Sequence, residues 1–284
     1  MKFYSPLRYP GGKNKLAKFI SLICVRNNIN GHYVEPYAGG ASVALYLLMN
    51  GYVDKITIND KDRAIYAFWY SVLHYNEKLC NKIKTTPVTM ESWEKYKKIY
   101  DNKKYESLFD LGFATFFLNR TNHSGIIDGG VIGGKDQKGN YKIDCRFNKK
   151  DLIRRIKLIA KYKSKINLSN LDALDLVKEI KKQSEKQNTI FYFDPPYYLK
   201  GPSLYMNHYK QIDHKKVSKK IQNIKGIRWI VSYDNVPEIE KLYSRSRKKE
   251  YSFFHTAQEI KKAEEFLFFS RDLIIPRILE PTKV

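Results

Sequence analysis

Acidic residues stand at the ends of several strand-like runs in this sequence. They are Glu35, Asp60, Asp172 and Asp194. In an open sheet of parallel strands, the carboxyl ends of the strands meet at one edge, and ligands bind there. We therefore expect these four carboxylates to lie around a common ligand site.

The most specific of these stretches is FYFDPPYY, residues 191–198. A strand-like aromatic run stops at Asp194, and the two prolines that follow each hold φ at about −65°, which gives a stiff turn. The exocyclic amine of a nucleobase is a poor nucleophile because its lone pair is delocalised into the ring. Acceptors on Asp194 and the Pro195 carbonyl could take its two hydrogens and direct its lone pair at an electrophile. We predict a catalytic corner made of Asp194, Pro195, Pro196 and Tyr197, with Tyr197 stacking on an extruded base.

A tight turn of small residues follows Glu35 and opens a helix. Ala38, Gly39 and Gly40 would let backbone amides approach a ligand closely, next to the positive end of the helix dipole. Asp60 ends the next strand-like run, close to the roughly 20-residue offset at which an acidic residue binds ribose hydroxyls. The chain lacks both GxGxxG and GxxxxGK[ST]. The pattern therefore favours a nucleoside-type ligand, while a helix-packing turn and a helix cap at Asp60 stay open as alternatives.

Strand-like and helix-like runs alternate along most of the chain, which predicts a parallel sheet with helices on both faces. The last two strand-like runs are joined by a link too short for a parallel crossover, so we expect them to be antiparallel. The expected strands are 32–37, 55–60, 166–173, 189–197, 227–234, 250–256 and 264–270, and the clearest expected helices are 41–49 and 213–224.

Residues 75–150 interrupt this alternation. They contain helix-like segments at 92–101 and 107–120 and a glycine-rich polar loop at 129–140, with no convincing strand. We predict a main domain of residues 1–74 and 151–284 with a mainly helical insertion at 75–150.

The chain of 284 residues has 52 Lys and Arg against 29 Asp and Glu, a formal net charge of +23. This excess favours a polyanionic partner, although a Lys-rich proteome would produce it too. A basic run at 142–165 could be a phosphate-contacting surface or a solvated helix face. The three cysteines have no paired spacing, so neither disulfides nor a zinc site are expected. No apolar run approaches a membrane span and the start lacks a signal-peptide core, so we expect a cytoplasmic protein without membrane contact.

Seven motifs, taken in order, resemble those of the Dam-like family of DNA adenine-N6 methyltransferases. The resemblance covers nearly the whole chain, and PGGK and NRTNxSG are its more family-specific parts. It implies a Rossmann-like fold of S-adenosylmethionine-dependent methyltransferases. The motifs are RYPGGK (8–13), YVEPYAGGASVAL (33–45), IND (58–60), FLNRTNHSGI (117–126), NLDALDL (170–176), FYFDPPY (191–197) and VSYDN (231–235).

The resemblance implies S-adenosylmethionine as the methyl donor and no metal. Tyr9 and Lys13 would help to hold the donor, above the loop from Glu35 through Ala38 and Gly39 to Gly40. Asp60 would bind its ribose hydroxyls and Asp172 its adenine amino group. Asp194, Pro195 and Tyr197 would grip the target adenine.

The segment FLNRTNHSGI resembles the DNA-contacting region of that family, so residues 75–150 would be the target-recognition subdomain. Where members specific for GATC have an arginine, this chain has Asp128, which cannot make the bidentate arginine contact with guanine. Recognition of GATC is therefore not expected. The candidates for DNA contact are Asn119, Arg120, His123, Ser124 and Arg146, and a structural role at the end of the helix stays open for Asn119 and Arg120.

The sequence thus predicts a site-specific enzyme that methylates adenine N6 in double-stranded DNA after flipping the base, without a covalent enzyme intermediate. Cytosine-N4 methylation uses the same amine chemistry, but those enzymes more often have Ser in place of Asp194. A catalytically silent DNA-binding paralogue would show damage at the donor site, which is intact in sequence. An RNA substrate ranks lower because no base-stacking sheet motif is present. No obligate protein partner is implied, and a restriction endonuclease acting on the same site is a possible companion.

Overall fold

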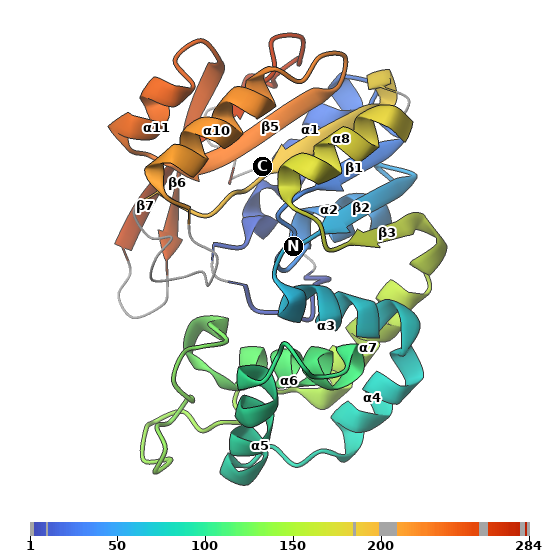
Figure 1. Ribbon diagram of the computed structural model, residues 1–284, viewed down its shortest axis with the longest axis vertical. Coiled ribbons are helices and arrows are strands. Elements are labelled where there is room, and N and C mark those ends of the chain that lie inside the picture. Colours follow the sequence, from blue (N-terminus) through green and yellow to red (C-terminus); the bar gives the residue numbers. More distant parts are fainter. Residues whose placement is uncertain are drawn as a thin grey trace. The chain divides into compact units, whose positions relative to one another are not determined.

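The computed structural model describes residues 3–9, 11–183, 186–198, 209–255, 261–278 and 282 (Figure 1). The chain divides into two compact units. Residues 1–12 and 61–170 form the first, called here the helical unit. Residues 13–60 and 171–284 form the second, called here the sheet unit.

The sheet unit contains six strands in the order β2-β1-β4-β5-β7-β6. The strands β2, β1, β4 and β5 are parallel, whereas β7 runs antiparallel to both β5 and β6. The predicted mostly parallel sheet with an antiparallel C-terminal hairpin is thus confirmed. The bounds are β1 His32–Glu35, β2 Lys55–Asn59, β4 Thr189–Phe193, β5 Arg228–Asp234, β6 Arg247–His255 and β7 Lys261–Phe269.

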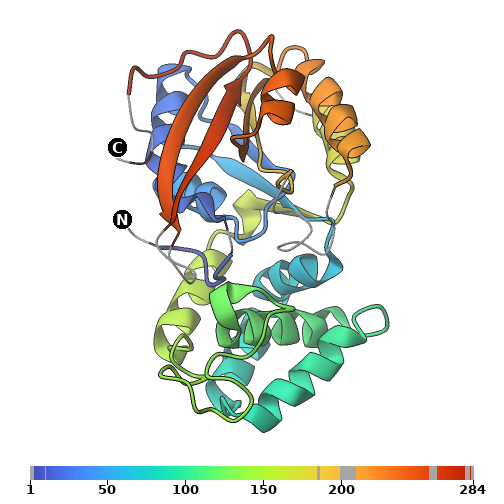
Figure 2. The ribbon, with the colours of Figure 1, turned by 90° about the vertical axis from the view of Figure 1, so that its left-hand side faces the viewer.

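Helices cover both faces of this sheet, with α1 and α2 on one side and α8, α10 and α11 on the other (Figures 1 and 2). Strands covered on both faces are mostly apolar, and every residue of β1 and β4 is buried, including the polar His32 and Glu35 at the two ends of β1. The helices are α1 Ala17–Arg26, α2 Ser42–Met49, α8 Ala173–Gln183, α10 Gln211–Gln222 and α11 Pro237–Leu242, with 3-10 turns η1 Lys13–Leu16 and η4 Lys186–Asn188.

A large apolar core lies between the sheet and the second group of helices. On α10, Val217 and Ile221 are one turn apart and point the same way, and Leu176 and Ile180 do the same on α8. They pack with Phe191 and other residues of β4, β5 and β7. By packing against one face of the sheet, this core holds the strands, and with them their carboxyl ends, in place.

The helical unit is built around α6 Leu108–Thr121, which is buried along most of its length. Gly112 permits close approach of α3, since a Cβ there would lie 2.4 Å from the Ala67 carbonyl oxygen. Phe68 and Phe116 stack between the same two helices at 5.8 Å. The other elements are α3 Arg63–His74, α4 Asn76–Thr85, α5 Met90–Asp101, η2 His123–Gly125, α7 Lys149–Ala160, η3 Lys163–Lys165 and β3 Ile166–Ser169.

Side-chain caps begin several of these helices at the residues that local sequence favours. Asp62, Thr89, Ser107 and Asn148 each accept a hydrogen bond from a backbone amide of the helix that follows. Such caps satisfy amides that have no partner within the helix. They explain why α3, α5, α6 and α7 start where they do.

All seven predicted strands are present, and residues 75–150 contain helices and the glycine-rich loop but no strand, as predicted. The compact helical unit extends beyond the predicted insertion, because α3 packs against α6 and α7 belongs with them. Pro10 of the predicted PGGK motif and Thr256 of a predicted strand lie outside the described residues. In the described ranges, no helix combines the length and apolar character of a membrane span.

Candidate active site

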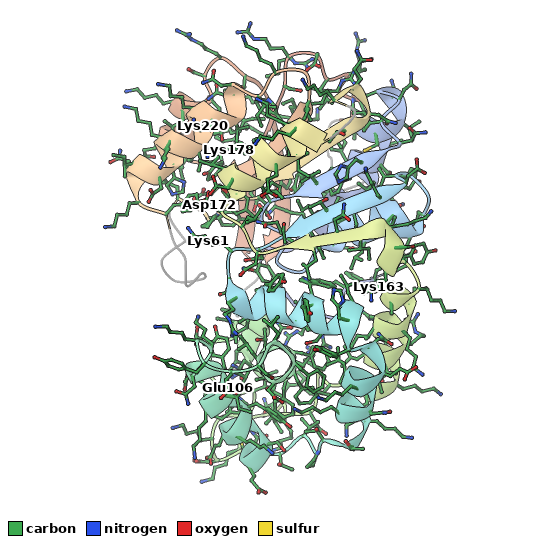
Figure 3. The ribbon with its side chains drawn as sticks, turned by 45° about the vertical axis from the view of Figure 1, so that its right-hand side comes forward. Lys61, Glu106, Lys163, Asp172, Lys178 and Lys220 are labelled. Carbon is green, nitrogen blue, oxygen red and sulfur yellow. The ribbon has the colours of Figure 1, made fainter. Side chains whose placement is uncertain are left out.

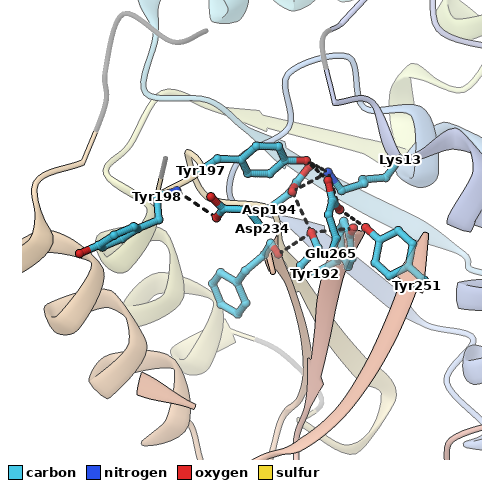
Figure 4. A network of polar contacts seen from close by, with 10 residues as sticks. Lys13, Tyr192, Asp194, Tyr197, Tyr198, Asp234, Tyr251 and Glu265 are labelled. Carbon is cyan, nitrogen blue, oxygen red and sulfur yellow. Dashed lines mark hydrogen bonds and ion pairs between the residues drawn. The ribbon is translucent and has the colours of Figure 1, made fainter. Parts of the chain in front are cut away.

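Asp194 directly follows β4 and is held through one carboxylate oxygen (Figure 4). Its Oδ1 accepts a hydrogen bond from Ser232 Oγ at 2.7 Å and pairs with Lys13 Nζ at 3.0 Å. Tyr192 in turn donates to Ser232 Oγ at 2.9 Å. Among the described residues, no donor contacts Asp194 Oδ2. The carboxylate is therefore oriented through Oδ1, and Oδ2 can accept from a ligand.

Lys13 is buried between two carboxylates of the sheet unit. Its Nζ lies 3.0 Å from Asp194 Oδ1 and 3.4 Å from Glu265 Oε2, and it donates a hydrogen bond to Tyr197 Oη. The Tyr197 hydroxyl donates to Glu265 Oε1 and the Tyr251 hydroxyl donates to Glu265 Oε2. These five side chains form one polar network that includes the predicted catalytic residues Asp194 and Tyr197 (Figure 4).

The network keeps Lys13 charged despite its burial. Burial alone would lower the pKa of Lys13, but Asp194 and Glu265 outweigh that effect and hold its pKa above the ordinary value. The pKa of Glu265 is raised above its ordinary value, because burial and the nearby Asp194 together outweigh the opposing effect of Lys13. Charges this far from water persist only when they are paired and hydrogen-bonded.

Tyr197 follows the two prolines and is fixed by its hydroxyl. Lys13 Nζ lies 4.9 Å from the centre of its ring, and the side chain is only 3% exposed. A base stacked on this ring would have to reach it through a local opening. The next residue, Tyr198, donates its backbone N–H to Asp234 Oδ1 at 3.0 Å, which ties the turn to the end of β5.

Glu35 caps the helix that follows the small-residue turn. Its Oε1 accepts from the Tyr33 hydroxyl at 2.9 Å and from the backbone N–H of Ala44, in the first turn of α2, at 3.0 Å. Burial raises the pKa of Glu35 to about 8, although these two hydrogen bonds favour the charged form. Sequence alone gave Glu35 only a ligand-binding role, whereas these contacts also make it a structural residue.

The predicted donor loop is closed by backbone and carboxylate contacts. The N–H of Gly39 donates to Asp60 Oδ2 at 2.9 Å, and that of Ala38 donates to the Asn59 carbonyl at 2.8 Å. Gly39 and Ala41 have positive φ values of 45° and 47°. This left-handed conformation favours glycine, which explains the glycine at position 39. Gly40 lies between them in the same turn. The structure thus brings the predicted loop and Asp60 together.

Asp172 stands at the start of α8, where its Oδ1 accepts from the Leu174 N–H at 3.0 Å (Figure 3). The adjacent Leu171 is tied to the end of β2, because its N–H donates to Asn59 Oδ1 at 2.8 Å. The Asn59 amide also donates to the carbonyls of Pro36 and Leu171. Asn59 therefore links the loop after β1 to the segment that carries Asp172.

In the helical unit, Asn119 is fully buried and holds the backbone around Arg8. Its side chain accepts from the Arg8 N–H at 2.8 Å and donates to the carbonyls of Arg8 and Gly125, each at 2.7 Å. These contacts give Asn119 a positioning role and do not support the predicted direct contact with DNA. Tyr9, the remaining predicted donor residue, follows Arg8 and is half-buried in this unit.

Four arginines lie near one another in the same unit, and one of them, Arg155, pairs with Asp151. Arg120 Nε donates to the Arg146 carbonyl at 2.7 Å, and Arg155 pairs with Asp151 at 2.7 Å. The pKa of Arg120 is lowered to about 10, first by burial and then by the neighbouring Arg8 and Arg155, while Asp151 opposes them. The pKa of Arg8 is lowered by burial and by Arg146. We call Arg8, Arg120, Arg146 and Arg155 the arginine cluster.

The loop after α6 presents the other predicted DNA-contacting residues. His123 is exposed, and Ser124 is half-buried with a positive φ of 56°. Asp128 is exposed and contacts Lys97 at 3.5 Å and the Tyr100 hydroxyl at 3.3 Å. Asp128 therefore cannot take the place of an arginine that binds guanine.

The sequence did not predict Tyr251 and Glu265 of this network, nor Ser232, which bonds Asp194. Ser232 sits within the VSYDN motif at the end of β5, two residues before Asp234. In the strand register, Glu265 of β7 lies opposite Asp234 of β5 on one side and opposite Tyr251 of β6 on the other. Because β7 is antiparallel, its amino end reaches the edge where the parallel strands end. The acidic pair at the start of EEFLFF was the available signal, but its register was needed to use it.

The family model described as D12 class N6 adenine-specific DNA methyltransferase matches residues 9–262. Comparison with curated proteins gives no match. Among solved structures, a proposed RNA methyltransferase from Pyrococcus horikoshii has a TM-score of 0.40 and 9% identity, covering 96% of this chain and 87% of that one. The rRNA methyltransferase AviRa from Streptomyces viridochromogenes has a TM-score of 0.37 and 9% identity, covering 88% and 83%. Similarities this distant say nothing about the substrate.

The family match spans the loop after β1, nearly all of the helical unit, the Asp194 corner and β6, and it ends at the start of β7. It agrees with the mostly parallel sheet and the carboxylates at the strand ends. The fold is therefore the Rossmann-like fold of methyltransferases, and the chain belongs to the D12 class N6 adenine-specific DNA methyltransferase family.

Proposed function

We propose that this protein transfers a methyl group from S-adenosylmethionine to N6 of an adenine swung out of double-stranded DNA. One observation carries the proposal: Asp194 is fixed through Oδ1 by Ser232 and Lys13, while Oδ2 has no donor among the described residues. It stands at the end of β4, followed by the rigid Pro195-Pro196 turn. A preoriented acceptor of this kind suits an amine that must be activated.

Asp194 Oδ2 and the Pro195 carbonyl would accept the two N6 hydrogens. This draws the nitrogen towards a pyramidal geometry, so that its lone pair leaves the plane of the base. When bound, S-adenosylmethionine supplies an electrophilic methyl group on its sulfonium. Asp194 would then take the proton that methylated N6 must lose, or pass it to water. Positioning and fixed electrostatics would supply most of the rate enhancement.

The residues around the loop after β1 fit the chemistry of this donor. S-adenosylmethionine carries a sulfonium, an amino group and ribose hydroxyls, all of which favour anionic acceptors. Asp60 is already oriented by the Gly39 N–H and would bind the ribose hydroxyls, and Asp172 would accept from the adenine amino group. Glu35, Ala38, Gly39 and Gly40 would line the loop, and Tyr9 would add a contact. Lys13 has Asp194 and Glu265 as its ionic partners, so we propose that it serves the catalytic corner rather than the donor.

The arginine cluster would contact DNA phosphates. Cations that lower the pKa of one another have too few carboxylate partners, and phosphates would supply the missing negative charge. Arg120 and Arg146 were predicted to contact DNA, and Arg8 and Arg155 join them. His123 and Ser124, on the adjacent loop, would approach the bases. Asp128 in this loop argues against GATC as the recognised sequence, because carboxylates accept from cytosine and cannot read guanine.

The test incubates the purified protein with methyl-labelled S-adenosylmethionine and duplex DNA, then digests the DNA and separates the nucleosides. We expect the label in N6-methyladenine. Label in N4-methylcytosine would contradict adenine as the target. Transfer to RNA but not to duplex DNA would contradict the substrate, and no transfer to any nucleic acid would contradict the activity.

A further inference from the structure

We propose that Glu265, on the C-terminal hairpin, is a positioning residue for methyl transfer, which together with Tyr251 holds Lys13 and Tyr197 so that Asp194 faces the target amine in one orientation. The proposal rests on the function proposed above. It assigns to β6 and β7 a part in the reaction that no motif in the sequence indicated.

The sheet topology brings Glu265 to the site. Strand β7 pairs antiparallel with β5, and Glu265 lies opposite Asp234, the last residue of β5. On its other side it lies opposite Tyr251 of β6. The amino end of β7 therefore meets the carboxyl ends of the parallel strands, where Asp194 stands.

Both oxygens of Glu265 are engaged by the site. Oε1 accepts from the Tyr197 hydroxyl, and Oε2 accepts from Tyr251 and pairs with Lys13. The Glu265 side chain is 2% exposed, and Tyr251 is also buried. A carboxylate in such surroundings has one orientation, and through Tyr197 and Lys13 it fixes two of the groups around Asp194.

Charge gives Glu265 a second effect on the reaction. Tyr197 and Tyr251 both donate to Glu265, which favours its ionised form. With Glu265 ionised, Lys13 and the two carboxylates carry a net negative charge, whereas Lys13 with Asp194 alone would be neutral. Methyl transfer makes N6 positive until its proton leaves. A fixed negative charge nearby stabilises that positive charge, and it does so strongly because the site is buried.

The pH dependence of methyl transfer distinguishes the positioning role of Glu265 from a role in packing alone. Both carboxylates raise the pKa of Lys13, so removing one brings its pKa down. If charged Lys13 holds Asp194, a variant without the Glu265 charge should lose activity as the pH rises, at values where the parent enzyme stays active. A role in packing alone would not move the pH profile.

The experiment compares Glu265→Gln with Glu264→Gln in the full-length protein. The first keeps the size and an acceptor oxygen but removes the buried charge, and the second removes a charge from an exposed position on the same strand. Single-turnover methyl transfer to duplex DNA is measured from pH 7 to 10. Calorimetry gives the affinity for S-adenosylmethionine, and thermal unfolding checks the fold.

For Glu265→Gln we expect transfer to slow by about 10- to 100-fold, as a small misplacement of reacting groups does, with donor affinity within about threefold of the parent. We also expect its rate to fall towards the alkaline end of this range, where the rate of the parent is flat, because the pKa of Lys13 has dropped. Glu264→Gln should match the parent in rate and profile. A Glu265→Gln protein with the parental rate and pH profile would overturn the proposal.

Tyr251→Phe provides a second test if Glu265→Gln does not fold. It removes one hydrogen bond to Glu265 Oε2 while keeping every charge. We expect a rate loss of about three- to tenfold with unchanged donor affinity. An unchanged rate would contradict the positioning role. Absence of transfer by the parent protein would instead contradict the proposed function, so the two failures are distinct.

Discussion

The two units of this protein treat positive charge in opposite ways. In the sheet unit, Lys13 is buried and shared between Asp194 and Glu265. In the helical unit, the arginine cluster has Asp151 as its nearby carboxylate among the described residues, and the pKa of Arg120 falls to about 10. Paired, buried charges hold reacting groups in place, whereas cations in excess attract a polyanion. Under the proposed function, this contrast would separate chemistry from binding within one chain.

This difference predicts different kinetic consequences in the two units. Changes around Asp194 should lower the rate of the chemical step and leave DNA affinity nearly intact. Changes in the arginine cluster should weaken DNA binding and its salt dependence, with less effect on the rate at saturating DNA. The predictions below test that separation, from the largest expected effect to the smallest.

Gly125→Ala should have the largest effect on stability, because the added methyl group would collide with the backbone of Arg8. Gly125 has φ of 76°, and a Cβ there would lie 2.1 Å from the Arg8 carbonyl oxygen. Left-handed strain and overpacking together should destabilise the protein by about 2 to 5 kcal/mol. Thermal unfolding measures this loss, and DNA affinity should fall with it.

Gly134→Ala is the matched control, since Gly134 has a similar φ of 74° but nothing within 4 Å of the added Cβ. It carries the strain without the collision, so it should lose only about 1 to 2 kcal/mol. Equal losses in the two variants would show that contact with Arg8 does not matter.

In the sheet unit, Glu35→Gln should change how the free energy of unfolding depends on pH. Burial raises the pKa of Glu35 to about 8, so the folded protein keeps a proton that the unfolded chain releases near pH 4.5. This contribution is fully present below pH 4.5 and is lost as the pH rises towards 8.

The parent should therefore lose up to about 3 kcal/mol more than Glu35→Gln between pH 5 and pH 8. Denaturant unfolding at several pH values measures the difference. Parallel curves for the two proteins would mean that Glu35 is ionised in the folded state at pH 5.

Arg146→Ala should have the smallest effect on free energy and leave the fold intact, because Arg146 is exposed. Losing one phosphate contact should weaken DNA binding by about 1 kcal/mol and reduce the slope of log affinity against log salt by about one. Lys178→Ala removes an exposed cation from α8 of the sheet unit and serves as the control (Figure 3). If both variants shift the salt slope alike, general charge rather than the arginine cluster binds the DNA.

Local sequence patterns predicted much of this molecule. The aromatic run into Asp194, the small residues after Glu35 and the spacing of apolar residues on α2 and α10 each reflect a short-range rule. Strands, helices and the carboxylates at strand ends followed from such rules, and the strand pairings confirm the sheet.

Local patterns could not predict which strands and helices lie side by side, or in which register. Glu265 reaches Lys13 because β7 lies antiparallel beside β5, and no residue near Glu265 in the sequence shows which strand is its neighbour. The boundary of the helical unit has the same cause: Gly112 allows α3 to pack closely on α6, a contact between segments about 40 residues apart. The sequence left both a DNA contact and a structural role open for Asn119, and only the structure shows that its amide bonds the backbone of Arg8 and Gly125.

Single-turnover methyl transfer by Asp194→Asn tests the central claim most directly. The substitution keeps the shape of the side chain but removes the negative charge and one of its acceptor oxygens. We predict that S-adenosylmethionine binds within about threefold of the parent affinity, while transfer to adenine in duplex DNA slows by at least about 100-fold. Transfer at the parental rate would contradict the assignment of Asp194 as the residue that activates the amine.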